Sequence, residues 1–267
     1  MDTATDIHAL RQAVASLEPS IRPRPGGRVA FGAGEVDAIL GGGLARGALH
    51  EIVPGGGADL PAAIGLAGGL CQRLDPDQAG MRGDIVWLRE RHSDGETGKI
   101  YPRGLREMGF PADRLILVRL KGIKLLLQAA MEAAGCDALG AVVVEIRQDS
   151  AALDLTTTRK LSLLAERSGL IVFCLRAPPK RGSSAAMTRW GVAAAPSRAL
   201  AANAPGLPAL DLKLLRHRMG SDGLSWRLEW NRDEQRFQEA PVSGAVVQYP
   251  AHRPAGPIVD YPWRRAG

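Results

Sequence analysis

Apolar residues recur along this chain with two different spacings, and the two spacings alternate from residue 83 onward. Short runs rich in valine, leucine and isoleucine predict strands, whereas apolar positions three and four residues apart predict helices. The predicted strands cover residues 84–89, 115–119, 141–146 and 170–175, and the predicted helices cover residues 103–108, 123–134 and 158–168. Apolar strands that alternate with helices are typical of a parallel sheet covered on both faces. The pattern therefore predicts an α/β fold.

Toward the C-terminus the pattern changes to strands joined by a turn. Residues 210–219 and 224–230 alternate in polarity on either side of a glycine-containing loop, which predicts a β-hairpin. Beyond Glu239 the chain contains five prolines and no sustained period, which predicts a flexible tail. Tyr261 and Trp263 in this tail are candidate partner contacts, although such residues also occur in tails without a role.

A separate amphipathic segment opens the chain. Residues 6–18 carry one narrow apolar stripe at helical spacing, formed by Ile7, Leu10, Val14 and Leu17. Prolines and glycines in residues 19–27 predict a linker. The stripe can dock on another surface or pack on the chain's own core, and the sequence leaves both open. The expected domains are a helix and linker (1–27), a core that includes the hairpin (28–238) and a proline-rich tail (239–267).

Composition fits one main domain with an anionic partner. With 267 residues and 45% apolar content, the chain can bury one large core. A net charge of +6 favours nucleic acid as the partner, although the excess is dispersed along the chain. No run approaches the roughly 20 apolar residues of a membrane span, and the N-terminus does not resemble a secretory signal. We therefore expect a cytoplasmic protein without membrane contact.

The three cysteines indicate no special chemistry. Cys71, Cys136 and Cys174 lie far apart in apolar or small-residue sequence, and no C-x-x-C pair is present. This spacing predicts neither a metal site nor a redox site. Buried free thiols are expected, because unpaired cysteine behaves as a small apolar residue.

The stretch from Val29 to Leu70 resembles the opening of a RecA-type recombinase core. That family shows a Gly/Ser turn, a short helix ending in Leu-Gly, a Gly-Gly-Leu step and then Gly-x-hydrophobic-Glu-Ile. The matching residues are Gly34, Asp37, Leu40, Gly41 to Leu44, Gly47, Leu49, Glu51 and Ile52. The resemblance implies a RecA-like, mostly parallel sheet flanked by helices.

In RecA-type proteins the phosphate-binding loop G-x-x-x-x-G-K-[ST] follows directly. Its backbone N–H groups and lysine hold phosphates, and its hydroxyl holds Mg²⁺. Aligned without gaps, this chain has a glycine run followed by residues that lack all three chemical roles. The glycines are Gly55, Gly56 and Gly57, and the second Gly, the Lys and the Ser/Thr of the motif fall on Asp59, Leu60 and Pro61.

These replacements remove the means of holding a nucleotide. A carboxylate repels phosphate at a helix N-terminus, leucine has no charge, and proline has neither a hydroxyl nor an N–H. The resemblance thus implies a degenerate nucleotide loop with weak or no affinity, no cofactor and no catalytic activity. A plain flexible glycine loop is the alternative.

Three further residues stand where the resemblance places parts of a nucleotide site. Glu90 ends the strand that carries the water-activating glutamate in RecA, although a solvated or ion-paired glutamate is the simpler interpretation. Glu145 occupies the Walker B aspartate position, where its extra methylene would disturb a Mg²⁺ site. Arg176 ends the strand whose last residue senses the γ-phosphate in that family. All three are interpreted as vestigial, with Arg176 also a candidate for meeting an anion.

Basic residues mark two candidate contacts with single-stranded DNA. Residues 177–196 occupy the place of the second DNA-binding loop of recombinases, and residues 216–218 form a basic stretch on the first hairpin strand. The candidates for phosphate contact and base stacking are Lys180, Arg181, Arg189, Trp190, Arg216 and Arg218. Alternatively, an edge strand begins at Thr188 with Trp190 in the core, and the hairpin arginines form a solvated face.

Together these features resemble the ImuA type of damage-inducible mutagenesis protein, which is related to the SulA division inhibitors. The resemblance implies a non-catalytic accessory role in error-prone translesion DNA synthesis. The implied partners are an inactive Y-family-like protein of the ImuB type, an error-prone replicative-type polymerase, RecA and single-stranded DNA. Two alternatives are a DNA-stimulated ATPase with an unorthodox loop and a SulA-like inhibitor of cell division.

Overall fold

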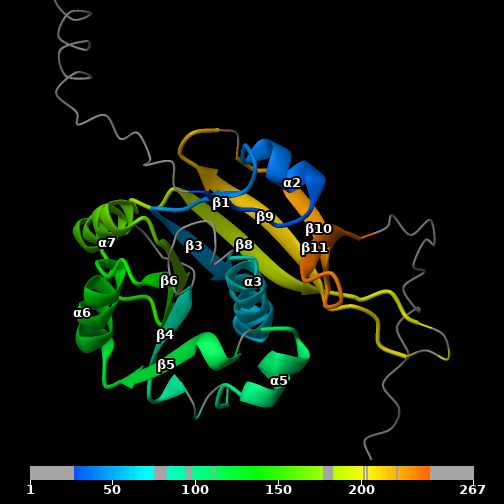
Figure 1. The fold of residues 1–267 in the computed structure, drawn as a ribbon, viewed down its shortest axis with the longest axis horizontal. Coiled ribbons are helices and arrows are strands. Elements are labelled where there is room, and N and C mark those ends of the chain that lie inside the picture. Colours follow the sequence, from blue (N-terminus) through cyan, green and yellow to red (C-terminus); the bar gives the residue numbers. More distant parts are fainter. Residues whose placement is uncertain are drawn as a thin grey trace, which may run out of the picture.

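The computed structural model describes residues 27–74, 83–93, 95, 98–110, 112–176, 183–200, 202, 204–220 and 222–240. The predicted N-terminal helix and linker with Ile7, Leu10, Val14 and Leu17 lie outside these residues, as do Lys180 and Arg181. The predicted tail with Tyr261 and Trp263 lies outside them as well. The described part forms one layered domain (Figure 1).

The strands and helices alternate through the first two thirds of the described chain. The strands are β1 (Arg28–Val29), β2 (Leu44–Ala45), β3 (Ala48–Pro54), β4 (Asp84–Glu90), β5 (Leu115–Leu120), β6 (Leu139–Ile146), β7 (Ile171–Arg176), β8 (Thr188–Ala195), β9 (Ala209–His217), β10 (Ser225–Asn231) and β11 (Arg236–Glu239). The helices are α2 (Gly34–Ile39), α3 (Leu60–Gln72), α5 (Pro102–Glu107), α6 (Ile123–Ala134) and α7 (Leu155–Ser168), with short 3₁₀ turns η1 (Gly57–Asp59) and η2 (Ala112–Arg114). Every strand and helix predicted from residue 83 onward is confirmed.

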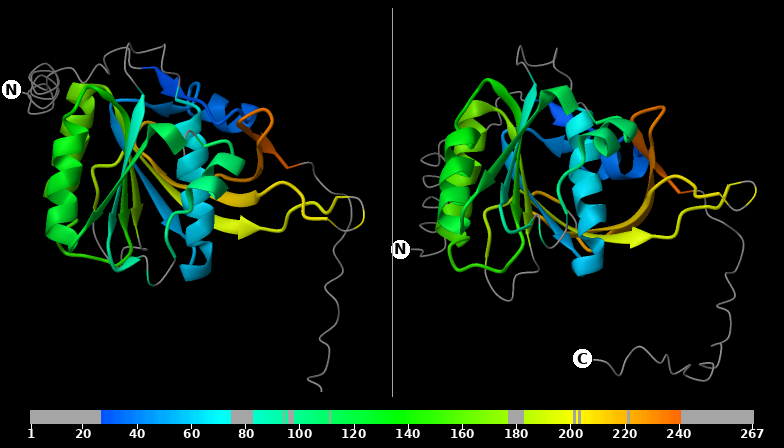
Figure 2. Two further views of the ribbon diagram at one scale, coloured as in Figure 1. Left: turned by 60° about the horizontal axis from the view of Figure 1, so that its bottom comes forward. Right: turned by 90° about the horizontal axis from the view of Figure 1, so that it is seen from below.

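Nine strands form one mixed sheet in the order β11-β10-β9-β8-β3-β7-β6-β4-β5. Neighbours from β8 to β5 pair in parallel, and β9, β10 and β11 extend the sheet in antiparallel fashion. Helices α6 and α7 cover one face, whereas α2, α3 and α5 lie on the other (Figure 2). The predicted α/β fold covered on both faces is confirmed.

Local sequence sets where the helices begin and end. The side chain of Asp154 caps α7 by accepting the backbone N–H of Thr157 at 2.7 Å. The same helix ends at Gly169, whose φ of 74° lies in the left-handed region that glycine adopts without cost. Helix α3 begins with Pro61 in its first turn, where the missing N–H removes no helical hydrogen bond.

The core has two parts, one on each face of the sheet. On the α3 face, Phe31 packs against Trp190 and Phe237 with ring centroids 5.4 and 5.9 Å apart, and Trp230 packs against Phe237 at 4.8 Å. Gly69 of α3 makes this packing possible, because a Cβ there would come within 2.6 Å of the Phe237 ring. Strand β11, which the sequence did not predict, therefore belongs to the core.

Two expectations need correction. Strand β8 does begin at Thr188, but it lies between β3 and β9 and is no edge strand. Cys71 and Cys174 are buried as expected, whereas Cys136, in the turn that follows α6, is exposed. Burial raises the pKa of the Cys174 thiol to about 12, so this thiol is inert at neutral pH. In the described part of the chain, no helix combines the length and apolarity that a membrane crossing requires.

Candidate functional site

The glycine loop joins the central strand β3 to helix α3. Strand β3 ends at Pro54, and α3 begins at Leu60 with Pro61 in its first turn. Leu60 is buried, so the start of the helix presents an apolar side chain and a proline to the loop. Neither residue can neutralise a phosphate or bind Mg²⁺.

Asp59 folds back against the loop. Its Oδ1 accepts the backbone N–H of Ala194 on β8 at 3.0 Å. A Cβ placed on Gly55 would lie 2.9 Å from Asp59 Oδ2, so the carboxylate packs directly against the glycines. The N–H of Gly55 donates to the carbonyl of Val192 at 2.9 Å, which fastens the loop to β8 a second time. The loop therefore already holds an anionic group that belongs to the chain.

A buried ion-pair network lies near the loop and joins the middle of β3 to the end of β7 and the start of β8. Glu51 is fully buried and accepts from Arg176 Nη1 at 3.1 Å and from Arg189 Nε at 2.5 Å. Arg176 Nη2 also lies 3.6 Å from Asp149 Oδ1. Glu51 and Arg189 are register partners in the parallel β3–β8 pair, which explains their approach. The anions that Arg176 meets are thus carboxylates of the same chain.

Glu145 is engaged in the same manner. Its side chain is buried, and its Oε1 accepts from Arg89 Nη2 at 3.3 Å, while its Oε2 lies 3.4 Å from Trp87 Nε1. Arg89 and Glu145 face each other in the parallel β4–β6 pair. Glu90, one residue further along β4, is also buried and lies 3.7 Å from His92 Nε2. Among the described residues, no group of three His, Cys, Asp or Glu side chains is arranged to hold a metal ion.

The space left beside the loop is small. A cavity of about 140 Å³ lies between Gly56, Gly57 and Leu60 on one side and Glu145, Arg147 and Arg176 on the other. Sites for cofactors and other small molecules usually enclose roughly 300–1,000 Å³. The cavity is therefore too small to enclose a nucleotide without rearrangement.

A second buried polar network connects β3 to β8. Trp190 Nε1 donates to Thr188 Oγ1 at 2.8 Å, and Thr188 Oγ1 lies 2.8 Å from His50 Nδ1. His50 Nε2 lies 2.9 Å from the Ala45 carbonyl, so the neutral ring donates from Nε2 and accepts at Nδ1. Burial lowers the pKa of His50 to about 4, with a smaller lowering by His217 and an opposing effect of the Ala45 bond. His50 is therefore neutral and structural at physiological pH.

The structure corrects the stacking prediction for Trp190. The side chain is 1% exposed and packs against Phe31 and Trp226 in the core, so no base can reach it. Arg189, which precedes it, is largely buried and its charge is matched by Glu51. The alternative that Trp190 is a core residue is the correct one.

The two hairpin arginines lie near the other end of β8. Arg216 Nη1 donates to the Ser184 carbonyl at 2.8 Å, and the exposed Arg218 Nη1 donates to the Ala185 carbonyl at 3.4 Å. His217 between them pairs with Thr188, whereas the glycine loop contacts Ala194, six residues further along β8. At about 3.3 Å per residue, the hairpin arginines and the loop are separated by roughly 20 Å. Sequence reasoning predicted both features, and the structure does not bring them together.

The sequence did not predict which residues pair with the candidate site residues. Asp149, Arg89 and the clamp of Asp59 on Ala194 carry no motif, because each contact depends on strand register or on a loop returning to the sheet. Glu51 was noted only as part of the RecA-like pattern, although it is the centre of the network. The only available signal was the presence of opposite charges within otherwise apolar strands.

Comparison with known proteins gives one clear relationship. No family model matches the chain. Protein ImuA from two strains of Caulobacter vibrioides, NA1000 / CB15N and ATCC 19089 / CIP 103742 / CB 15, is 32% identical over 186 residues. The aligned part spans 63% of this chain and 69% of each relative.

Among solved structures, the RadB recombinase matches with a TM-score of 0.53 at 16% sequence identity. The match covers 79% of this chain and 99% of that chain. At this identity the likeness concerns the fold alone, and it confirms the RecA-like architecture that the sequence predicted.

Proposed function

The chain belongs to the ImuA family of damage-inducible mutagenesis proteins, and on that premise we propose a non-catalytic accessory role in error-prone translesion DNA synthesis. Family membership assigns the chain to damage-induced mutagenesis in general terms. The proposal adds that the RecA-like core serves as a scaffold and turns over no nucleotide.

The observation that carries the proposal is the filled glycine loop. Asp59 lies against the glycines, Leu60 and Pro61 begin the helix, and the adjoining cavity measures about 140 Å³. A bound triphosphate would have to displace a carboxylate and would find no lysine at the helix start. Beside it, Arg176, Arg189 and Arg89 are already paired with Glu51 and Glu145.

The proposed partners are those that the sequence resemblance implies. They are a Y-family-like protein of the ImuB type, an error-prone replicative-type polymerase, RecA and single-stranded DNA. The apolar stripe of the first 18 residues and the tail with Tyr261 and Trp263 are the proposed protein contacts. Lys180, Arg181, Arg216 and Arg218 are the proposed DNA contacts, of which Arg218 is exposed in the structure.

A DNA-stimulated ATPase is the second candidate. The RecA-like fold is related to ATPases, and Glu90 and Glu145 stand at the strand ends where such enzymes carry acidic residues. Against it, Arg89, Arg176 and Arg189 near the loop are engaged in ion pairs. The Glu51 and Glu145 pairs would have to open before these three arginines could bind a phosphate.

Affinity purification of the tagged full chain from DNA-damaged cells, followed by mass spectrometry, tests the accessory role. The expected result is recovery of an error-prone polymerase together with a Y-family-like protein, with both absent from a purification of the tag alone. Recovery of a division protein in their place would contradict the accessory role and favour the SulA-like alternative.

A further inference from the structure

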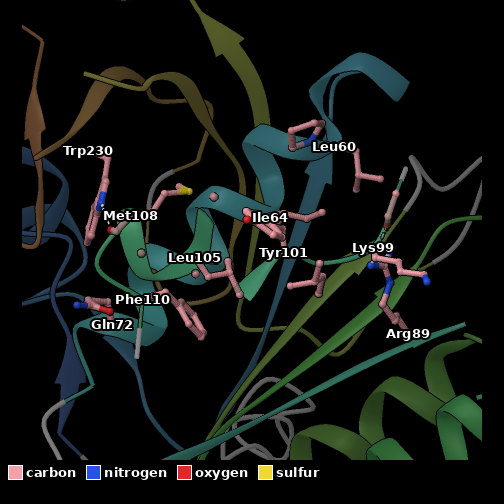
Figure 3. Close-up of a pocket in the computed structure, with 16 residues that line it drawn as sticks. Leu60, Ile64, Gln72, Arg89, Lys99, Tyr101, Leu105, Met108, Phe110 and Trp230 are labelled. Atoms are coloured by element: carbon pink, nitrogen blue, oxygen red, sulfur yellow. Dashed lines mark hydrogen bonds between the residues drawn. The ribbon is translucent and has the colours of Figure 1, made fainter. Parts of the chain in front are cut away.

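A pocket on the side of α3 that faces α5 is open and strongly apolar (Figure 3). It encloses about 260 Å³ between α3, the segment 98–101, α5 and Trp230 of β10. Its walls include Ile64, Leu105, Met108 and Phe110. Three glycines of α3 line it, namely Gly65, Gly68 and Gly69. At this volume it suits one large side chain better than a cofactor.

The two ends of the pocket differ in chemistry. Trp230 and Gln72 lie at one end, and Arg89 and Lys99 lie at the other (Figure 3). Trp230 Nε1 donates to the Met108 carbonyl at 3.0 Å, so the indole is satisfied. The Oε1 atom of Gln72 is buried and has no hydrogen-bond partner among the described residues. A buried acceptor of this kind costs free energy until a donor reaches it.

The rim formed by the segment 98–101 and α5 carries more exposed positive than negative charge. Lys99, Arg103 and Arg106 are exposed on the segment and helix that form one wall, with Glu107 as the one acidic residue of α5. Tyr101, which also lines the pocket, is 62% exposed beside them. An acidic partner would be attracted to this rim, and a basic one repelled.

We propose that this pocket binds a tryptophan or tyrosine side chain presented by an acidic segment of a partner protein. The ring fills the apolar cavity, its N–H or O–H donates to Gln72 Oε1 after the Gln72 amide turns toward the cavity, and neighbouring carboxylates meet the cationic rim. This proposal rests on the accessory role in one respect, because it requires that a partner protein exists. It adds the chemistry of the segment that this partner presents.

Segments of the same chain fit less well. Residues 1–26 contain no aromatic side chain that could fill the pocket. Residues 241–267 carry tyrosine and tryptophan, but Arg253, Arg264 and Arg265 outnumber the single Asp260 there. Charge therefore favours a segment of another protein.

Peptide binding to the purified full chain tests the inference by fluorescence anisotropy. The probe is a labelled synthetic ten-residue peptide with one tryptophan flanked by glutamates. Matched peptides replace the tryptophan with phenylalanine or alanine, or the glutamates with lysine. We expect the tryptophan peptide to bind at least tenfold more tightly than the phenylalanine peptide. The difference in affinity between the tryptophan and alanine peptides should be larger still. Undetectable binding of the tryptophan peptide, or equal binding of all four, would overturn the inference.

Variants of the chain then assign binding to the pocket. Gly65→Met directs a side chain into the cavity, and the nearest atom to a Cβ there is Met108 Cε at 3.9 Å, so no backbone clash arises. Methionine also has a higher helix propensity than glycine, so thermal stability should not fall. Peptide binding should weaken at least tenfold in Gly65→Met and persist in the control Gly65→Ala. Unchanged binding in Gly65→Met would contradict the proposed site.

Two further substitutions separate the hydrogen bond from the charge. Gln72→Leu should abolish the preference for tryptophan over phenylalanine, because the acceptor is gone. Arg103→Glu with Arg106→Glu should weaken binding of the acidic peptide, whereas Arg159→Glu on α7, on the opposite face, should not. Failure of these peptide tests would leave the polymerase purification result unaffected, so the two proposals can fail separately.

Discussion

Leu60, at the start of α3, lines two hollows of opposite chemistry. On the loop side, glycines and buried charged residues surround about 140 Å³, and Glu51, Glu145 and Asp59 each have a partner within the chain. On the α5 side, about 260 Å³ of apolar space remains open and holds one buried acceptor without a partner. The charged residues beside the glycine loop are thus satisfied by one another, whereas the α5 side of the same helix keeps apolar room for binding.

Removing the charge of Glu51, at the centre of the buried ion-pair network, should lower the unfolding free energy most. Glu51→Gln leaves Arg176 and Arg189 buried beside a neutral side chain. Removing one member of a buried ion pair typically costs about 3–5 kcal/mol of unfolding free energy. Urea denaturation would measure this loss.

The control for this substitution is Asp211→Asn, which removes an exposed pair with Arg227. We expect it to cost less than about 1 kcal/mol. A loss below about 1 kcal/mol for Glu51→Gln as well would show that the buried network contributes nothing beyond a surface pair.

The second largest loss of unfolding free energy should come from acidification, which acts on His50 in the polar network between β3 and β8. His50 has a pKa lowered to about 4 in the folded chain, so only the unfolded chain takes up this proton between pH 6.5 and about 4. The free energy of unfolding should therefore fall as the pH drops through this window, by about 3 kcal/mol at most. Comparing the pH dependence of wild type with His50→Gln isolates this contribution. The same slope in both proteins would assign the acid sensitivity to other groups.

The arginines proposed to contact DNA should behave differently from the buried arginines of the network. Arg181→Glu with Arg218→Glu should weaken binding of a single-stranded oligonucleotide about tenfold and reduce its salt dependence, because phosphate contacts are lost. The unfolding free energy should change little. Arg159→Glu on α7 serves as the control. Equal oligonucleotide binding by the double variant and wild type would refute the proposed DNA contacts.

The smallest effect is expected at the loop clamp. Asp59→Ala removes the hydrogen bond that the Asp59 carboxylate accepts from the Ala194 N–H, and this bond is exposed to solvent. A single bond of this kind contributes about 1 kcal/mol. Thermal unfolding would detect this loss of stability. An increase in stability would instead show that packing the Asp59 carboxylate against the glycines destabilises the fold.

Sequence periodicity was sufficient for the elements that depend on neighbouring residues. The strand at 141–146 and helix 123–134 are apolar in patterns that need no distant partner, and both were predicted. The sequence resemblance also led to the RecA-like sheet, because the motif around Glu51 and Ile52 is local.

Contacts that depend on strand register could not be predicted from the sequence. Glu51 and Arg189 are 138 residues apart and meet only because β8 pairs with β3 in one particular register. For the same reason the sequence left Trp190 open between a stacking residue and a core residue, since its burial depends on Phe31 and on the hairpin strands. The apolar pocket was not predicted either, because three α3 glycines and Trp230 converge only in the folded chain.

Isothermal titration calorimetry of the purified full chain with ATP and Mg²⁺ would show whether the protein binds nucleotide. We expect no binding heat at nucleotide concentrations up to about 1 mM, because the proposed alignment puts Asp59, Leu60 and Pro61 where RecA-type proteins carry their phosphate-binding groups. A micromolar dissociation constant that disappears when Gly55, Gly56 and Gly57 are substituted would contradict this expectation.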